Sequence, residues 1–327
     1  MESERTVADA SADDVYPVHV PWVAVTIFVV VAFGLAWLVT LPLWFSGGLA
    51  SPLASILLVV MMFTPAVAAL LVVFFVQRPR PASIPRYLGL WPLRPLKRTI
   101  WMIVAAVFGS IAIVVGGALL VVALGLATLD LVNFSGFAAQ IASLSSKPLP
   151  IPIQLLAVLQ LVSIPAGALI NALFTIGEEL GWRGWLLPSL RPLGTWPALV
   201  ISGAVWGLWH SPVILLGYNF GEPNLLGVAL MVGGCVLYGI LVGWLRLRTG
   251  SIWPSVFAHA AFNAAGGFLL LVSVAGTPVS SPALSPLGWV TWIIMGLVIA
   301  ALALAGQFGK SGSLSAAAPR RLSRPQK

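Results

Sequence analysis

The stretch TIWMIVAAVFGSIAIVVGGALLVVALGL, residues 99–126, contains no charged side chain. About 20 apolar residues in an α-helix are enough to cross the hydrocarbon core of a bilayer. This stretch is therefore long enough to span a membrane. It is also too long and too continuously apolar for a strand of a transmembrane barrel, in which apolar and polar residues alternate.

Similar stretches recur along the chain and predict eight spans in all. They cover residues 22–45, 53–76, 99–126, 151–177, 196–217, 225–245, 252–275 and 287–306. The chain of 327 residues is 59% hydrophobic and 8% charged, whereas soluble domains carry about 25% charged residues. Together these features predict an all-α fold, a polytopic transmembrane helix bundle of about eight spans.

The basic residues predict how the bundle is oriented, because Lys and Arg are enriched in cytoplasmic loops. With a cytoplasmic N-terminus, 16 of the 17 Lys and Arg residues fall on the cytoplasmic side and Lys147 alone falls outside. We therefore expect a multi-pass protein of the cell membrane with both termini in the cytoplasm. The net charge of +8 does not indicate nucleic-acid binding, because the basic residues are not gathered in one folded basic domain.

The two ends of the chain differ from the middle. Residues 1–20 hold five acidic residues and Arg5 as the one Lys or Arg, so they are expected to form a disordered cytoplasmic tail rather than a cleavable signal peptide. Residues 309–327 are basic and rich in Ser, Ala and Pro, and a second disordered tail is expected there. Residues 21–308 form the predicted membrane-embedded domain.

Ionisable side chains in membrane helices are functional candidates, because a charge in the bilayer is costly. Among the acidic residues, Glu178 and Glu179 sit at the end of an apolar stretch, while His210 and His259 lie inside two others. Residues four apart share a helix face. Arg183 is therefore expected to pair with Glu179.

The same spacing places Asn263 on one helix face with His259. Two adjacent carboxylates, two histidines and an amide suit the activation of water. A carboxylate or a histidine can take the proton from water, and the other groups can donate hydrogen bonds to the developing oxyanion. The alternative is a catalytic zinc held by the histidines and a carboxylate, with one position left for water.

Three motifs in this order resemble the signature of the CPBP family, which includes CAAX prenyl endoproteases and bacterial Abi proteins and is also called CAAX protease self-immunity. The resemblance covers about residues 165–270, the expected catalytic core. Trp206 stands where family members often have Phe. The motif residues are Glu178, Glu179 and Arg183, then Trp206 and His210, then His259 and Asn263.

The resemblance implies an eight-helix bundle whose cavity opens toward the cytoplasm. It implies that Glu178 activates water with help from His210, and that Glu179 with Arg183 supports them. It also implies that His259 and Asn263 stabilise the oxyanion.

If zinc is used, the expected ligands are Glu178, His210 and His259. The sequence lacks the H-E-x-x-H spacing typical of zinc proteases, and Asn263 suits an oxyanion hole better than a zinc site. Both points favour catalysis without a metal.

The expected function is therefore that of an intramembrane endopeptidase acting on a membrane-associated peptide or protein, prenylated or bacteriocin-like. A catalytically idle scaffold or immunity protein is one alternative. A proton-coupled transporter is another, since Glu and His inside helices also relay protons. The chain shows no internal repeat of the kind that many transporters have, and its intramembrane polar residues cluster in the second half.

One spatial question stays open at this point. The expected orientation puts Glu178 near the cytoplasmic face, while His210 lies about 15 residues into the next span, roughly 22 Å along a helix. The two can cooperate if the fourth span continues beyond Glu178. Otherwise residues 181–195 form a helix outside the bilayer.

Overall fold

The computed structural model describes residues 16–78, 83–91, 93, 95–144, 150–278 and 280–309. Most of both expected tails, residues 1–15 and 310–327, lies outside these ranges. Within them the protein is helical and forms no strand beyond an isolated bridge between Leu129 and Ser273. The predicted all-α bundle is confirmed.

Among the described residues, six helical segments are long and apolar enough to cross a membrane. They are α1 (Trp22–Phe45), the run Ala54–Gln77 made of α2 (Ala54–Met62), α3 (Thr64–Leu71) and a π-helical turn (Val72–Gln77), α5 (Leu96–Ala123), the run Ile153–Leu193 that begins with α7 (Ile153–Glu179), α11 (Leu225–Thr249), and the run Trp253–Val272 made of α12 (Trp253–Ala265) and α13 (Phe268–Val272).

The remaining two predicted spans are helical but shorter. The eighth is α14 (Trp289–Leu304), with 16 residues. The fifth is α9 (Thr195–Trp209), followed by the single turn of α10 (Ser211–Ile214). Three short helices complete the description: α4 (Ile84–Tyr87), α6 (Ser135–Leu144) and α8 (Leu187–Leu190).

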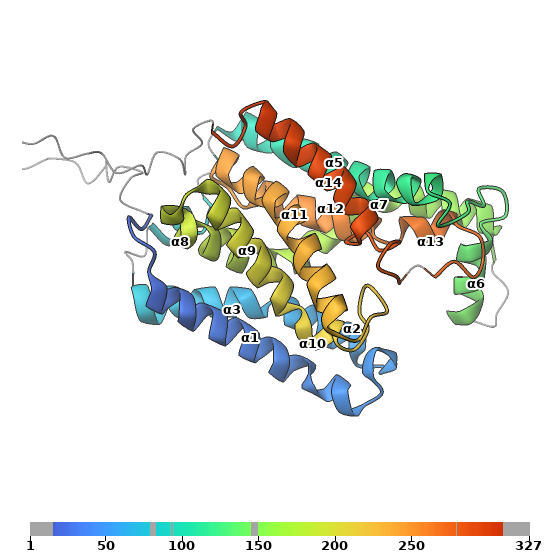
Figure 1. Ribbon diagram of the computed structural model, residues 1–327, viewed down its shortest axis with the longest axis horizontal. Coiled ribbons are helices and arrows are strands. Elements are labelled where there is room, and N and C mark those ends of the chain that lie inside the picture. The colour runs from blue at the N-terminus through green and yellow to red at the C-terminus, as the bar shows by residue number, and fades with distance from the viewer. Residues whose placement is uncertain are drawn as a thin grey trace, which may run out of the picture.

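The helices pack in layers. In Figure 1, α1 and α3 lie together along one side of the bundle and α5 and α14 along the opposite side, with α9, α11 and α12 between them. Glycines bring α9 and α11 close together. A Cβ on Gly203 would lie 2.7 Å from the Cα of Val236, and a Cβ on Gly207 would lie 2.5 Å from the Cα of Val232. Small residues at such positions let membrane helices approach closely.

The fourth span does not end at the two glutamates. The helix runs on through a π-helical segment (Leu180–Leu186) and α8 to Leu193, so that the continuous stretch has 41 residues. Gly181 allows this path, because a Cβ there would lie 2.7 Å from the carbonyl carbon of Pro65 in α3. The open question is thus answered: the span continues past Glu178, which lies inside the bundle.

Candidate active site

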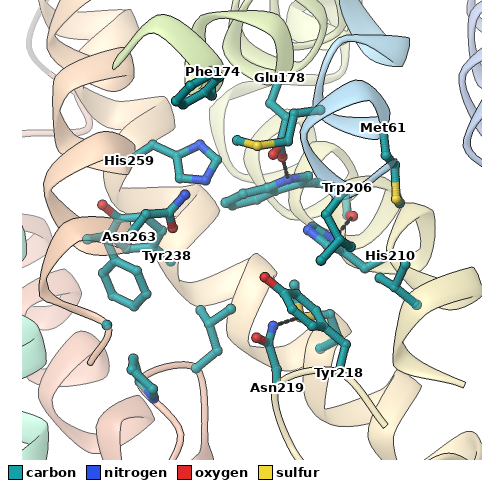
Figure 2. A pocket seen from close by; sticks show the side chains of 18 of the residues that line it. Met61, Phe174, Glu178, Trp206, His210, Tyr218, Asn219, Tyr238, His259 and Asn263 are labelled. Carbon is teal, nitrogen blue, oxygen red and sulfur yellow. Dashed lines mark hydrogen bonds between the residues drawn. The ribbon is translucent and has the colours of Figure 1, made fainter. Parts of the chain in front are cut away.

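A cavity of about 530 Å³ lies within the bundle. Its wall includes the Glu178, His210, His259 and Asn263 side chains that the sequence singled out, together with Trp206. They come from α7, α9, α12 and the residue that follows α9, and Figure 2 shows them around one space. Ligand pockets in proteins commonly have volumes of about 300–1,000 Å³.

Glu178 lies on the last turn of α7 with 3% of its surface exposed. Its Oε2 accepts a 2.7 Å hydrogen bond from the indole Nε1–H of Trp206 (Figure 2). From the sequence, Trp206 was noted as standing where family members often have Phe. The indole is in fact a hydrogen-bond donor to the candidate water-activating carboxylate, a contact that Phe at this position cannot make.

Glu179 joins the other two motifs. Its Oε1 accepts hydrogen bonds from Arg183 Nη1 at 2.8 Å and from His259 Nδ1 at 3.0 Å, and all three residues are buried. The predicted Glu179–Arg183 pair is confirmed. Because a carboxylate only accepts, Nδ1 of His259 carries a hydrogen, and Nε2 is left for the cavity.

The His210 ring is held by the backbone. The α9 helix ends at Trp209, and the His210 amide donates to Gly207 O in a tighter turn. His210 Nδ1 lies 2.9 Å from the Trp206 carbonyl oxygen. A carbonyl accepts, so Nδ1 of His210 carries the hydrogen and Nε2 of His210 is left as an acceptor. In both histidines, therefore, Nδ1 makes the bond that holds the ring and Nε2 stays available.

Trp206 forms the centre of the site. Its ring lies 4.1 Å from the Arg183 guanidinium carbon, a distance at which a cation and an aromatic face attract. The His259 ring meets it edge-on with the centroids 5.2 Å apart. One indole thus contacts Glu178, Arg183 and His259 and fixes their relative positions.

Several lining residues were missed from the sequence. Tyr238 of α11 lines the cavity, and its hydroxyl donates to Ala258 O at 2.8 Å. A polar ring in the middle of a predicted span was the signal for it. Tyr218 and Asn219 follow the predicted span 196–217, and Asn171 lies inside the predicted span 151–177, and all three also line the cavity.

The three residues expected to bind zinc do not form a ligand set in this arrangement. Within the described residues, no group of three His, Cys, Asp or Glu side chains is placed to hold a metal ion. Glu178, His210 and His259 surround Trp206, and one oxygen of Glu178 is engaged by the indole. These side chains do not fit a zinc centre.

Comparison with known proteins agrees with the motifs. Residues 158–265 match the model of the family described as "Type II CAAX prenyl endopeptidase Rce1-like". A protein named CAAX prenyl protease 2 from Methanococcus maripaludis is 28% identical over 93 residues, which make up 26% of this chain and 34% of that protein. The chain therefore matches about a third of the length of that relative.

All seven motif residues fall within the matched range 158–265. Around them the structure has a helical bundle with apolar helices of membrane-spanning length. The resemblance predicted from the sequence is confirmed: residues 158–265 of this chain are similar to the Rce1-like family of CAAX prenyl endopeptidases.

Proposed function

We propose that this protein is an intramembrane endopeptidase that hydrolyses peptide bonds of a membrane-associated substrate. The observation that carries the proposal is that a buried carboxylate, Glu178, lines the same cavity as His210, His259 and Asn263. The segment that matches the CAAX endopeptidase family contains these residues. They suit peptide hydrolysis, because that reaction needs a base to activate water and hydrogen-bond donors to stabilise an oxyanion.

Glu178 is the base in this mechanism. Its Oε2 is held by Trp206, while Oε1 has no protein hydrogen-bond partner among the described residues. Oε1 takes a proton from a water molecule as the water oxygen adds to the carbonyl carbon of the substrate. His210 Nε2 accepts a hydrogen bond from the same water and orients it. The C–N bond then breaks, and Glu178 returns its proton to the leaving amine.

Asn263 and His259 act on the other oxygen. The tetrahedral intermediate carries a negative charge on the former carbonyl oxygen, and hydrogen-bond donors fixed in advance stabilise it. Asn263 offers an amide N–H. His259, whose Nδ1–H is held by Glu179, offers a second donor when Nε2 also carries a hydrogen.

The substrate that we propose is a peptide attached to the membrane, prenylated or bacteriocin-like. Apolar side chains of α2 and α7, including Leu58, Met62 and Phe174, line the cavity beside the polar cluster. Such a wall suits an apolar segment next to the bond that is cleaved.

Purified protein tests the proposal on a library of fluorescence-quenched membrane peptides. Wild type is compared with Glu178→Gln, His210→Ala and His259→Ala, each with and without a zinc chelator. We expect cleavage by wild type, its loss in the variants, and no effect of the chelator. Equal inactivity of all four proteins on a broad library would favour the idle scaffold or the transporter, and inhibition by the chelator would contradict the metal-free mechanism.

A further inference from the structure

The bundle has one strongly cationic end, formed by the turns that follow the second, fourth and sixth spans. Contacts hold these turns next to one another: the Arg246 side chain donates to the carbonyl oxygen of Tyr87 at 2.9 Å, and the Tyr87 hydroxyl lies 2.8 Å from the hydroxyl of Ser189 near the end of the fourth span. The described basic residues of this cationic end are Arg78, Arg86, Lys97, Arg98, Arg191, Arg246 and Arg248.

The opposite end is formed by the described connections 46–53, 124–144, 150–152, 215–224, 273–278 and 280–288. These also contact one another. The Val274 amide donates to Thr128 O at 3.0 Å, and a Cβ on Gly221 would lie 2.8 Å from the carbonyl oxygen of Ser280. The described residues of these connections include Asp130 and Glu222 but no Lys or Arg.

The catalytic cavity reaches this second end. Tyr218 and Asn219 of one connection and Ser285 and Pro286 of another line it, and Figure 2 shows Tyr218 and Asn219 across the space from Glu178. A further cavity of about 270 Å³ shares these four residues and extends to Leu49. None of the described residues of 78–95, 191–194 and 249–252, at the cationic end, lines either cavity.

Apolar packing separates the site from the cationic end. Beyond Glu178 the helix continues through Trp182 and Trp185, both without exposed surface. Their rings pack on Phe28 of α1 with centroids 5.5 and 4.7 Å away. This part of the bundle has the close packing of a protein core, whereas the part toward the second end is hollow.

Cationic loops stay in the cytoplasm during membrane insertion, so the second end lies on the extracytoplasmic side. We propose that the candidate active site takes its substrate from that side: the substrate is a polypeptide segment at the extracytoplasmic membrane surface, which enters past Tyr218 and Asn219. This inference rests on the proposed function. It differs from the cytoplasmic mouth that the family resemblance implies.

Single-cysteine labelling in intact cells tests the direction of access without requiring activity. The native Cys235 is fully buried and is replaced by Ala. Reporter cysteines are introduced one at a time as Val132→Cys at the second end, Asn219→Cys at the cavity mouth and Lys97→Cys at the cationic end. Permeabilised cells give the total labelling of each variant.

With a membrane-impermeant maleimide we expect Val132→Cys and Asn219→Cys to label fully in intact cells, and Lys97→Cys to label only after permeabilisation. Labelling of Lys97→Cys alone in intact cells would overturn the inference, because the cavity would then open to the cytoplasm. Labelling of Val132→Cys without Asn219→Cys would overturn it too, because the mouth would then be closed.

A vesicle assay separates this inference from the proposed function. A water-soluble quenched peptide is added outside right-side-out or inverted membrane vesicles, with Glu178→Gln vesicles as the control. We expect cleavage by right-side-out vesicles only, and cleavage by inverted vesicles only would overturn the inference. Failure of both preparations, with the labelling as expected, would count against the protease and would leave the direction of access standing.

Discussion

The indole Nε1–H of Trp206 donates a 2.7 Å hydrogen bond to Oε2 of Glu178, across 28 residues of sequence and between two helices. The bond fixes one carboxylate oxygen and leaves the other for water. A Phe at position 206 has no N–H and could not make this bond. The donor is therefore a positioning feature of this chain.

Replacing Trp206 with Phe keeps most of the ring and removes the donor. A hydrogen bond to a charged group contributes about 1.5–3 kcal/mol, so we expect kcat to fall roughly 10- to 100-fold with a small change in KM. Steady-state kinetics on a cleaved peptide measure this. Trp185→Phe is the matched control, because it removes another buried indole bond, to Gln77 at 3.0 Å, away from the cavity. Equal effects of both substitutions on kcat would refute a specific role of Trp206.

The Glu179–Arg183 pair is buried and also holds His259. Removal of one partner from a buried ion pair costs about 3–5 kcal/mol, because the other charge is left uncompensated. We therefore expect Arg183→Met to lower the Tm in detergent strongly, and the double variant Glu179→Gln/Arg183→Met to recover part of the loss. Tm losses that simply add in the double variant would show that the two charges do not depend on each other.

Asp130 caps the turn that leads into α6. Its carboxylate accepts from the backbone amides of Asn133 at 2.8 Å and Ser135 at 3.1 Å. The pKa of Asp130 is lowered from 3.8 to about 2. The largest cause is the hydrogen bond from the Ser135 side chain, and the next is the hydrogen bond from the Asn133 amide. Because the pKa is lower in the folded protein, the stabilisation is complete above pH 3.8 and is lost as the pH falls toward 2.

Hydrogen–deuterium exchange, corrected for intrinsic rates, measures this local stability. We expect the amides of residues 132–135 to lose protection between pH 4 and pH 2 in wild type. Asp130→Asn should lack that pH dependence and show the lower protection throughout. A parallel pH response in the two proteins would assign the change to another group.

Gly181 lies where the span continues past the site. A Cβ there would be 2.4 Å from the Pro65 Cβ and 2.7 Å from its carbonyl carbon. Overpacking of this kind typically costs about 1–3 kcal/mol, so Gly181→Ala should lower the Tm and, by shifting the helix, the activity. Gly34→Ala is the control, since a Cβ at Gly34 meets nothing within 4 Å. If the Tm of Gly181→Ala is no lower than that of the control, α3 shifts to make room for the methyl group without a loss of thermal stability.

The sequence predicted most of the membrane architecture, because long apolar stretches have few alternatives to helix in a bilayer. The first span matches α1 at both ends. The course of the fourth span was not predictable. Gly181, Gly184 and Pro188 are residues typical of a bend. The chain instead continues as a π-helical segment, which packs against α3 and α1.

The site was predictable to a similar degree. The four-residue spacing within a helix predicted that Glu179 lies beside Arg183. The same spacing predicted that His259 and Asn263 share one helix face. The Trp206–Glu178 hydrogen bond depends on how two separate helices pack together. The position of Tyr218 and Asn219 in the cavity wall depends on how a loop packs against them. No periodicity within one segment encodes such contacts.

The central claim is that Glu178 activates water for peptide hydrolysis. The most direct test is the cleavage rate of Glu178→Gln relative to wild type, on one peptide, with ¹⁸O-water used to label the new carboxyl group. Loss of a general base commonly costs about 10²- to 10⁴-fold in rate. We predict a fall in that range, with ¹⁸O in the wild-type product. A Glu178→Gln variant that still cleaves at the wild-type rate would contradict the account.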